Sequence, residues 1–480
     1  MSHIEIAAET SPVKITSKRD LSVIWLLLGA AFVVILNETI MGVAIPNLVT
    51  DLGITIAAAQ WLTTAFMLTM AVIIPITGFL LQRFTTRQIF TAAMSLFSAG
   101  TLVSALAPGF EVLLTGRIIQ ATGTAIMMPL LMTTIMTLVP AESRGRFMGR
   151  ISIVMAAAPA LGPTLSGLIL SLASWRFMFW LVLPIAIFML VRGNRRLENI
   201  GETQNTPIDI LSVVLSAFGF GGVVFGLSLV GGTGNAATQM WIALGAGALG
   251  IAAFIWRQLV LQRSERALLD LRVFRSRNFT ISISLMTVMM AAMFGTIILL
   301  PIYLQNVLQL SPVMTGMLML PGGLLMGLIA PVVGRIYDKS GPRPLVIPGS
   351  IIVSAVLWSL TQLTENTPVL MILLAHMALN LGLALMFTPL FTTALGSLGP
   401  KLYAHGSATV GAIQQVAGAA GTSLFITIMS ARSLELMTAG TEALAAEAGG
   451  IRAAFLIGAV ISLVAIAGAF LVKRPAVPQE

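Results

Sequence analysis

The sequence contains no cysteine and few charged residues. The absence of cysteine rules out disulfide bonds, thiolate catalysis and cysteine-ligated metal sites. Charged residues make up 9% of the 480 residues and hydrophobic residues 57%, whereas soluble proteins average about 25% and roughly 45–50%. This composition excludes a soluble globular enzyme and predicts a surface that faces mostly lipid.

Histidines and nucleotide-binding motifs are also scarce. The three histidines, His3, His376 and His405, lie far apart in the chain, and no G-x-S-x-G nucleophile motif occurs. Without a Gly-Lys dipeptide, the chain has no G-x-x-x-x-G-K loop to hold the phosphates of ATP. We therefore expect neither an enzyme nor an ATP-driven pump, and no cofactor.

Apolar runs long enough to cross a bilayer recur along the whole chain. A helix needs about 20 residues to cross roughly 30 Å of hydrocarbon, and these runs do not alternate as barrel strands do. We predict an all-α polytopic membrane protein with fourteen transmembrane helices. They lie near residues 21–46, 57–81, 88–107, 110–139, 147–170, 176–191, 208–230, 239–260, 278–306, 313–336, 344–362, 367–397, 407–430 and 452–472.

Basic residues are distributed asymmetrically between the loops. If both termini are cytoplasmic, 23 of the 27 Lys and Arg lie inside, three lie outside, and Arg117 lies within a span. This distribution follows the positive-inside rule. The net charge of +9 therefore reflects topology and not nucleic-acid binding, and we expect a multi-pass protein of the cell membrane with both termini cytoplasmic.

One sequence pattern, P-x-x-G-x-x-x-(Q/D)-(R/K)-x-x-x-R, occurs twice with an offset of 256 residues. Removing the two spans between the copies leaves six spans on each side, as in a duplicated six-helix unit. We predict two pseudo-symmetric six-helix bundles plus two inserted helices. The predicted segments are a tail at 1–20, a bundle at 21–191, linkers with the inserted helices (about 208–230 and 239–260) at 192–277, a bundle at 278–472 and a tail at 473–480.

These motifs resemble those of the major facilitator superfamily, specifically its fourteen-span drug:proton antiporters. Residues 78–87 (GFLLQRFTTR) and 334–343 (GRIYDKSGPR) are similar to the signature G-x-L-a-D-R-x-G-R-K. In the fourth span LLTGRIIQATG resembles R-x-x-Q-G-x-G, and in the fifth APALGPTLSG is similar to the antiporter motif G-x-x-x-G-P-x-x-G-G. The resemblance implies conformational roles for Gly78, Gln82, Arg83, Gly162, Pro163, Gly167, Gly334, Asp338 and Arg343.

Glu38 and Arg117 are the two charged residues that lie clearly within predicted spans. The helix rise places them about 12 Å and about 10 Å below the same membrane edge, so they are level. If their spans adjoin, as the resemblance implies, Arg117 favours ionised Glu38 while apolar surroundings favour its protonated form. We predict that this pair couples transport to protons, the alternative being a static buried ion pair.

Polar, aromatic and methionine side chains on these spans are candidates for a substrate cavity. The 27 methionines are roughly twice the usual share, and their soft surface suits greasy ligands. The competing interpretations are a hydrogen-bonded helix seam for the polar residues, and core packing or anchoring at the bilayer interface for the apolar ones. The candidates are Asn37, Gln120, Thr124, Met293, Phe294, Tyr303 and Phe387.

The function that we predict is export of lipophilic, cationic compounds in exchange for external protons, with antibiotic resistance as the consequence. The runner-up is an exporter or flippase of lipids or another amphiphilic metabolite. The expected partners are the lipid bilayer and small lipophilic substrates, and we expect a monomer that binds no nucleic acid. The outer loop at 431–451 is long and amphipathic enough for a short helix of its own.

Overall fold

The structure, a computed structural model, describes residues 18–197, 199, 207–230 and 235–475. Within these ranges the chain forms fourteen helices long and apolar enough to cross a membrane, and no strand. The predicted all-α class and the number of spans are confirmed. The helices are α1 (Lys18–Leu52), α2 (Ile56–Arg83), α3 (Thr86–Ala105), α4 (Phe110–Leu138), α5 (Arg144–Leu172), α6 (Arg176–Arg196), α7 (Ile210–Ser228), α8 (Asn235–Leu261), α9 (Arg277–Ile302), α10 (Pro312–Ser340), α11 (Arg343–Leu360), α12 (Val369–Gly396), α13 (Tyr403–Thr438) and α14 (Ala443–Ala469).

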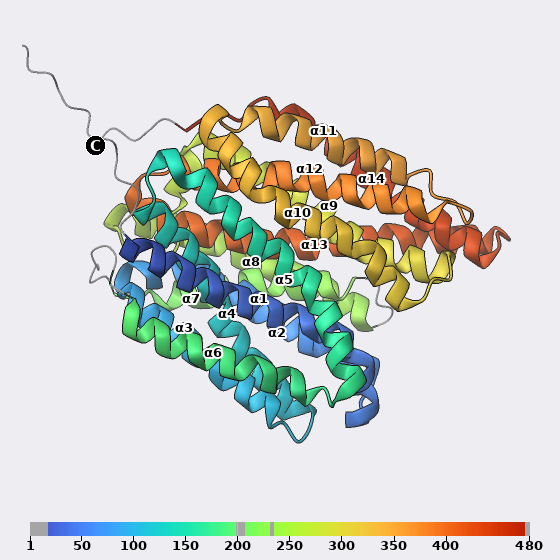
Figure 1. Ribbon diagram of the computed structural model, residues 1–480, viewed down its shortest axis with the longest axis horizontal. Coiled ribbons are helices and arrows are strands. Elements are labelled where there is room, and N and C mark those ends of the chain that lie inside the picture. Colours follow the sequence, from blue (N-terminus) through green and yellow to red (C-terminus); the bar gives the residue numbers. More distant parts are fainter. Residues whose placement is uncertain (1–17, 198, 200–206, 231–234, 476–480) are drawn as a thin grey trace, which may run out of the picture.

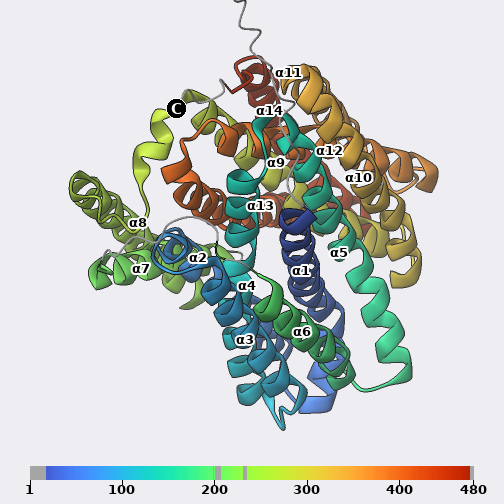
Figure 2. The ribbon, with the colours of Figure 1, turned by 60° about the vertical axis from the view of Figure 1, so that its left-hand side comes forward.

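The helices form two bundles with matching contacts (Figures 1 and 2). In the first, α2 packs on α4, α3 on α6 and α1 on α5; in the second, α10 packs on α12, α11 on α14 and α9 on α13. The bundles meet along two seams, α2 with α13 and α5 with α10, which are equivalent under the same correspondence. The internal repeat of the sequence is therefore also a repeat of packing.

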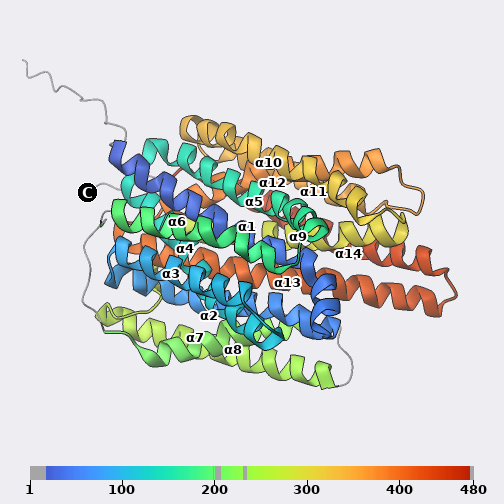
Figure 3. The same cartoon turned by 60° about the horizontal axis from the view of Figure 1, so that its bottom comes forward.

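The described ends of the chain lie at the same end of the molecule (Figure 3). We call this the terminal end, and the opposite one the distal end. Several hydrogen bonds join the bundles in the terminal half, among them Arg144 Nη2 to Tyr403 Oη at 3.0 Å, Thr133 Oγ1 to Ser407 Oγ at 3.2 Å, and Ser152 to Thr388 at 2.7 Å between hydroxyls. The conformation is closed at the terminal end.

The inserted pair, α7 and α8, lies on one flank of the molecule (Figure 2). Helix α7 packs on both α2 and α13 and so covers the α2–α13 seam. Its contact with α2 is close, because a Cβ on Gly221 would lie 3.2 Å from Val72 Cγ2, and the rings of Trp61 and Phe225 are 5.7 Å apart.

An ion pair ties the two inserted helices together. Asp209, which caps α7, accepts hydrogen bonds from Arg257 of α8 at 2.9 and 3.1 Å. These bonds, aided by those from Ser212, lower the pKa of Asp209 to about 2. The carboxylate stays ionised at neutral pH and holds the pair as one unit.

The predicted short helix in the loop at 431–451 does not form. Instead α13 continues to Thr438 and α14 begins at Ala443, so the two helices leave only a tight turn between them. Gly440, at φ +87°, makes this turn, and Gly450 of α14 packs against Met429 of α13. The segment is rich in strong helix formers and gains more by extending a packed hairpin than by forming a separate element.

Candidate functional site

Arg117 is fully buried inside the first bundle, with 1% of its surface exposed. Its Nη1 donates to Asn37 Oδ1 of α1 at 3.1 Å and to Gln120 Oε1 at 2.6 Å. The guanidinium lies 4.1 Å from the centre of the Phe66 ring of α2, a cation–π contact. Residues from three helices therefore hold this charge, and sequence reasoning had missed Phe66.

Two of the polar cavity candidates, Gln120 and Thr124, form a polar stripe on α4, and Gln120 lies in the contact between α3 and α4. Gln120 Nε2 donates to Thr101 Oγ1 at 2.7 Å, and Thr124 Oγ1 donates to the Gln120 carbonyl at 3.1 Å. Gln120 is 0% and Thr124 3% exposed. In this conformation the stripe is a hydrogen-bonded helix seam that orients the oxygen of Gln120 toward Arg117.

Glu38 lies on a different side of α1 from Asn37. A Cβ on Gly29 would lie 3.0 Å from Met189 of α6, and Glu38, nine residues later, is about 180° around the helix. Asn37 reaches α4, while the Thr39 hydroxyl approaches the Ala158 carbonyl of α5 at 3.4 Å. Glu38 is thus on the face turned away from α6, and it is half-buried.

Glu38 and Arg117 are near each other without forming an ion pair. Among the described residues, no contact of 4.0 Å or less joins the Glu38 carboxylate to the guanidinium, whose bonds go to Asn37 and Gln120. The two groups are nevertheless close enough to interact electrostatically. Because its carboxylate is not locked in a pair, Glu38 can take up or release a proton without first breaking a salt bridge.

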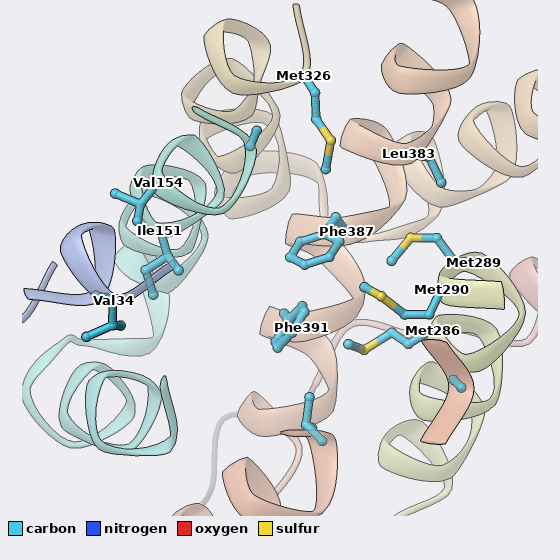
Figure 4. Close-up of a cluster of buried hydrophobic side chains, with 14 of the residues drawn as sticks. Val34, Ile151, Val154, Met286, Met289, Met290, Met326, Leu383, Phe387 and Phe391 are labelled. Carbon is cyan, nitrogen blue, oxygen red and sulfur yellow. The ribbon is translucent and has the colours of Figure 1, made fainter. Parts of the chain in front are cut away.

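A cluster of methionine and aromatic side chains fills the space between the bundles (Figure 4). We call it the central cluster. The rings of Phe387 and Phe391 on α12 lie 4.8 Å apart at its middle. It comprises Val34, Ile151 and Val154 from the first bundle and Met286, Met289, Met290, Met326, Leu383, Phe387 and Phe391 from the second.

The central cluster separates Glu38 from the terminal end. Val34 is four residues before Glu38, so the two side chains share a face of α1. Glu38 lies about 6 Å closer to the distal end by helix rise. The acid therefore sits at the distal boundary of a buried apolar cluster, with part of its side chain still exposed.

The other aromatic and methionine candidates occupy different places. Met293 is half-buried one turn beyond Met289, against the same core. Phe294 packs on α13, where a Cβ on Gly418 would lie 3.1 Å from its ring. Tyr303 donates from its hydroxyl to the Thr364 carbonyl at 2.5 Å. That bond ties it to the loop after α11 at the distal end, and not to Phe387.

One glycine of the fifth span, Gly162, serves a helix crossing. A Cβ on Gly162 would overlap the hydroxyl of Thr39, whereas one on Gly167 would meet nothing within 4 Å. Helix α5 continues through this motif without interruption; the side chain of Pro163 lies outside the described ones. Gly162 thus permits α1 to approach α5 next to Glu38.

The two copies of the repeated motif, residues 78–87 and 334–343, run from the last turns of α2 and α10 into the loops that follow, and we call them the repeated loops. They make different contacts across the seams. Asp338 accepts hydrogen bonds from the backbone N–H groups of Gly145 at 2.7 Å and Arg146 at 2.9 Å, at the start of α5. At the equivalent position Gln82 donates to the Lys401 carbonyl, before α13, at 3.0 Å. One loop thus presents an anion to a helix N-terminus, and the other forms a neutral bond.

The glycines of these loops allow the seams to close. Gly334 packs against the backbone of Gly145, and a Cβ on Gly78 would lie 3.1 Å from the ring of His405. Arg343 donates to the carbonyls of Phe470 and Val472 beyond α14, at 3.1 and 2.9 Å. Arg83 is the last residue of α2, the helix that forms the other seam with α13.

An ion pair that sequence reasoning missed lies at the distal end. Asp51 accepts from Trp175 Nε1 at 2.7 Å and from Arg176 at 3.1 Å, and both bonds lower the pKa of Asp51. Asp51 and Trp175 line a pocket of about 580 Å³ together with Asn47 and Thr50. The contact joins the end of α1 to the start of α6. Asp51 and Trp175 are 124 residues apart in the sequence, so their proximity could not be predicted from it.

Twelve of the fourteen described apolar helices form two equivalent bundles around a central cluster, and α7 and α8 lie on one flank. This architecture defines a multi-pass membrane transporter. Residues 27–422 match the family model described as Major Facilitator Superfamily. The chain belongs to this superfamily, and the family and its relatives are transporters and not enzymes.

Several curated bacterial proteins are similar over most of their length. The lincomycin resistance protein LmrB of Listeria monocytogenes is 40% identical, covering 95% of this chain and 97% of that protein. The uncharacterized MFS-type transporter YcnB of Bacillus subtilis is 41% identical, with coverage of 95% and 96%. The multidrug resistance protein B homolog of Mycobacterium tuberculosis is 30% identical, covering 87% of this chain and 78% of that protein.

Solved structures share the fold. The human organic anion transporter MFSD10 superposes with a TM-score of 0.65 at 15% identity, covering 95% of this chain and all of that one. The proton:xylose symporter XylE gives a TM-score of 0.62 at 15% identity, with coverage of 94% and 96%. At this level of identity the likeness extends to the fold alone.

Proposed function

We propose that the protein is a proton-coupled antiporter of the cell membrane that exports lipophilic, cationic drugs by alternating access. The observation that carries this proposal is the position of Glu38, a half-buried acid at the distal boundary of the central cluster, on the face of α1 turned away from α6. The similarity to proteins named for lincomycin and multidrug resistance supports the substrate class.

Both termini lie in the cytoplasm in this scheme. The excess of Lys and Arg in the loops of the terminal end supports that orientation. The terminal-closed conformation is then the outward-facing one, and Glu38 meets the external solution. An external proton binds its carboxylate, and the neutral acid tolerates the apolar surroundings that form as the distal end closes.

Opening of the terminal end separates the central cluster and exposes its methionines and phenylalanines. These soft, adaptable side chains suit planar or greasy cations of varied shape. Substrate entry favours release of the Glu38 proton to the cytoplasm, because the carboxylate and the cation attract each other. Exchange of one proton for a monovalent cation moves no net charge, so the pH gradient drives it. A difference of one pH unit supplies about 1.4 kcal/mol, which sustains a tenfold gradient of the cation.

Transport in proteoliposomes with an imposed pH gradient tests this function. We expect the wild type to accumulate a cationic dye such as ethidium against its gradient, and Glu38→Gln to allow only downhill exchange. Glu111→Gln, which neutralises an exposed acid at the start of α4, is the matched control and keeps accumulation. Active transport by Glu38→Gln would refute the coupling, and transport of phospholipid analogues alone would establish the lipid exporter instead.

A further inference from the structure

Three arginines from both bundles gather at the terminal end of the α5–α10 seam. Arg146 and Arg150 are one turn apart on α5, and Arg335 is on α10. The helices touch here, because a Cβ on Gly334 would lie 3.2 Å from the Cα of Arg146. Arg150 is within electrostatic range of both other guanidinium groups. We call these three residues the arginine cluster.

No carboxylate forms a close ion pair with the arginine cluster in the described part of the chain, although Asp338 interacts electrostatically with Arg146. Among the described residues, none of the three guanidinium groups lies within 4.0 Å of a carboxylate. The nearby acid is Asp338, and its two oxygens accept from the backbone of Gly145 and Arg146. Arg146 and Arg335 are exposed and Arg150 is half-buried. Three like charges repel one another, so an anion from outside the chain stabilises this arrangement.

The arginine cluster lies at the depth of lipid headgroups. Arg150 is six residues from the start of α5, or about 9 Å, and Arg335 is five residues from the end of α10, or about 8 Å. The Arg150 guanidinium is 5.4 Å from the ring of Trp25, which is 54% exposed. Exposed tryptophan is typical of the membrane interface.

An apolar strip leads from the arginine cluster toward the middle of the membrane. Leu328, Val332 and Ile336 are 76%, 47% and 39% exposed. They are spaced four residues apart and so share one face of α10, adjoining Arg335. A ligand that satisfies both features has an anionic head and an aliphatic tail.

We propose that the arginine cluster binds the phosphate of an anionic phospholipid, such as phosphatidylglycerol, whose acyl chain lies along the strip on α10. Guanidinium groups suit phosphate because they offer several donors in a fixed plane. The ligand contacts both bundles and bridges them at the closed terminal end. This site depends on neither proton coupling nor substrate identity.

Native mass spectrometry of the purified full-length protein tests the site. We expect the delipidated wild type to bind phosphatidylglycerol at least tenfold more tightly than phosphatidylcholine. The triple variant Arg146→Gln/Arg150→Gln/Arg335→Gln loses about 100-fold in affinity for phosphatidylglycerol, at about 1 kcal/mol for each arginine. The corresponding triple lysine variant retains the charges and recovers most of the binding, which shows that misfolding is not the cause.

The matched control removes three exposed arginines from the same end but from the opposite flank: Arg263→Gln/Arg266→Gln/Arg277→Gln. It keeps the affinity of the wild type. An equal loss in this control would mean a diffuse charge effect and would overturn the site. Displacement of the lipid by millimolar glycerol 3-phosphate would also overturn it, because the headgroup alone would then account for binding.

Discussion

Thr39, the residue after the proposed proton carrier Glu38, meets Gly162 where α1 crosses α5. The Thr39 hydroxyl donates to the Leu36 carbonyl at 2.9 Å and lies against Gly162. This contact fixes the rotation of α1 and therefore the face that Glu38 presents. A side chain at position 162 would push α1 away and turn the acid.

We predict that Gly162→Ala destabilises the protein by about 1–3 kcal/mol, as overpacking of a tight contact does. Gly167→Ala, five residues later on the same helix, is the control, because its Cβ would enter open space. It should be neutral or slightly stabilising, since alanine favours helix more than glycine by up to about 1 kcal/mol. Thermal unfolding followed by tryptophan fluorescence measures both, and equal effects would contradict the packing role.

At this scale the sequence predicted the depth of the charged residues but not their partners. Glu38 and Arg117 were expected to be level, and both lie in adjoining helices. The residue bonded to Arg117 is Asn37, the neighbour of Glu38. Helix rise follows from residue number alone, whereas the rotation of one helix relative to another depends on contacts such as Thr39 with Gly162.

At the scale of elements, the two repeated loops hold the seams with unequal strength. Asp338 places a negative charge at the N-terminus of α5, where the helix dipole and two free N–H groups favour it. Gln82 makes a single neutral bond to Lys401. The α5–α10 seam should therefore resist opening more than the α2–α13 seam does.

We predict that Asp338→Asn favours opening of the terminal end by roughly tenfold, because an anion at a helix N-terminus contributes about 1–2 kcal/mol. The readout is maleimide labelling of Ser152→Cys, a buried site between the bundles in a chain without other cysteines. Gln82→Ala should accelerate labelling only about threefold. The asymmetry is refuted if the two variants label at the same rate.

The repeat in the sequence predicted that these loops are equivalent, and the matching packing of the two bundles agrees with it. Sequence alone did not reveal that Gln82 acts as a donor and Asp338 as an acceptor to different backbone groups. The extension of α13 and α14 in place of a separate loop helix was also missed. That outcome depends on the packing of α14 on α13, a contact that hydropathy does not report.

At the scale of the whole molecule, the inserted pair makes the two flanks unequal. Helix α7 covers the α2–α13 seam and packs closely on α2. The α5–α10 seam carries a close backbone contact between the bundles, at Gly145 and Gly334. Alternating access requires the bundles to separate there, whereas α7 can travel with α2.

Two disulfide tethers test whether the bundles separate at the α5–α10 seam while α7 moves with α2. A tether between Val72→Cys and Gly221→Cys should leave transport within about twofold of the untethered protein, because α2 and α7 move together. A tether between Ala156→Cys and Gly327→Cys, where the Cβ atoms would be 3.6 Å apart, should abolish transport until it is reduced. Loss of transport with the first tether would show that the inserted pair moves independently of α2.

Hydropathy predicted the helix number, since spans follow from the cost of burying polar groups in lipid. The division into two bundles was predicted from the repeated motif. The closed terminal end was not predictable. It depends on bonds such as Arg144 with Tyr403, which arise only after both bundles are assembled. The central cluster likewise joins residues that no spacing in the sequence relates.

Proton release from the purified protein on substrate binding tests the coupling by Glu38 most directly. In weakly buffered detergent solution, with a pH-sensitive dye, ethidium should displace about one proton from each wild-type molecule. Glu38→Gln should bind ethidium and release none, while Glu111→Gln behaves like the wild type. Release of one proton by Glu38→Gln would contradict the assignment of Glu38 as the proton carrier.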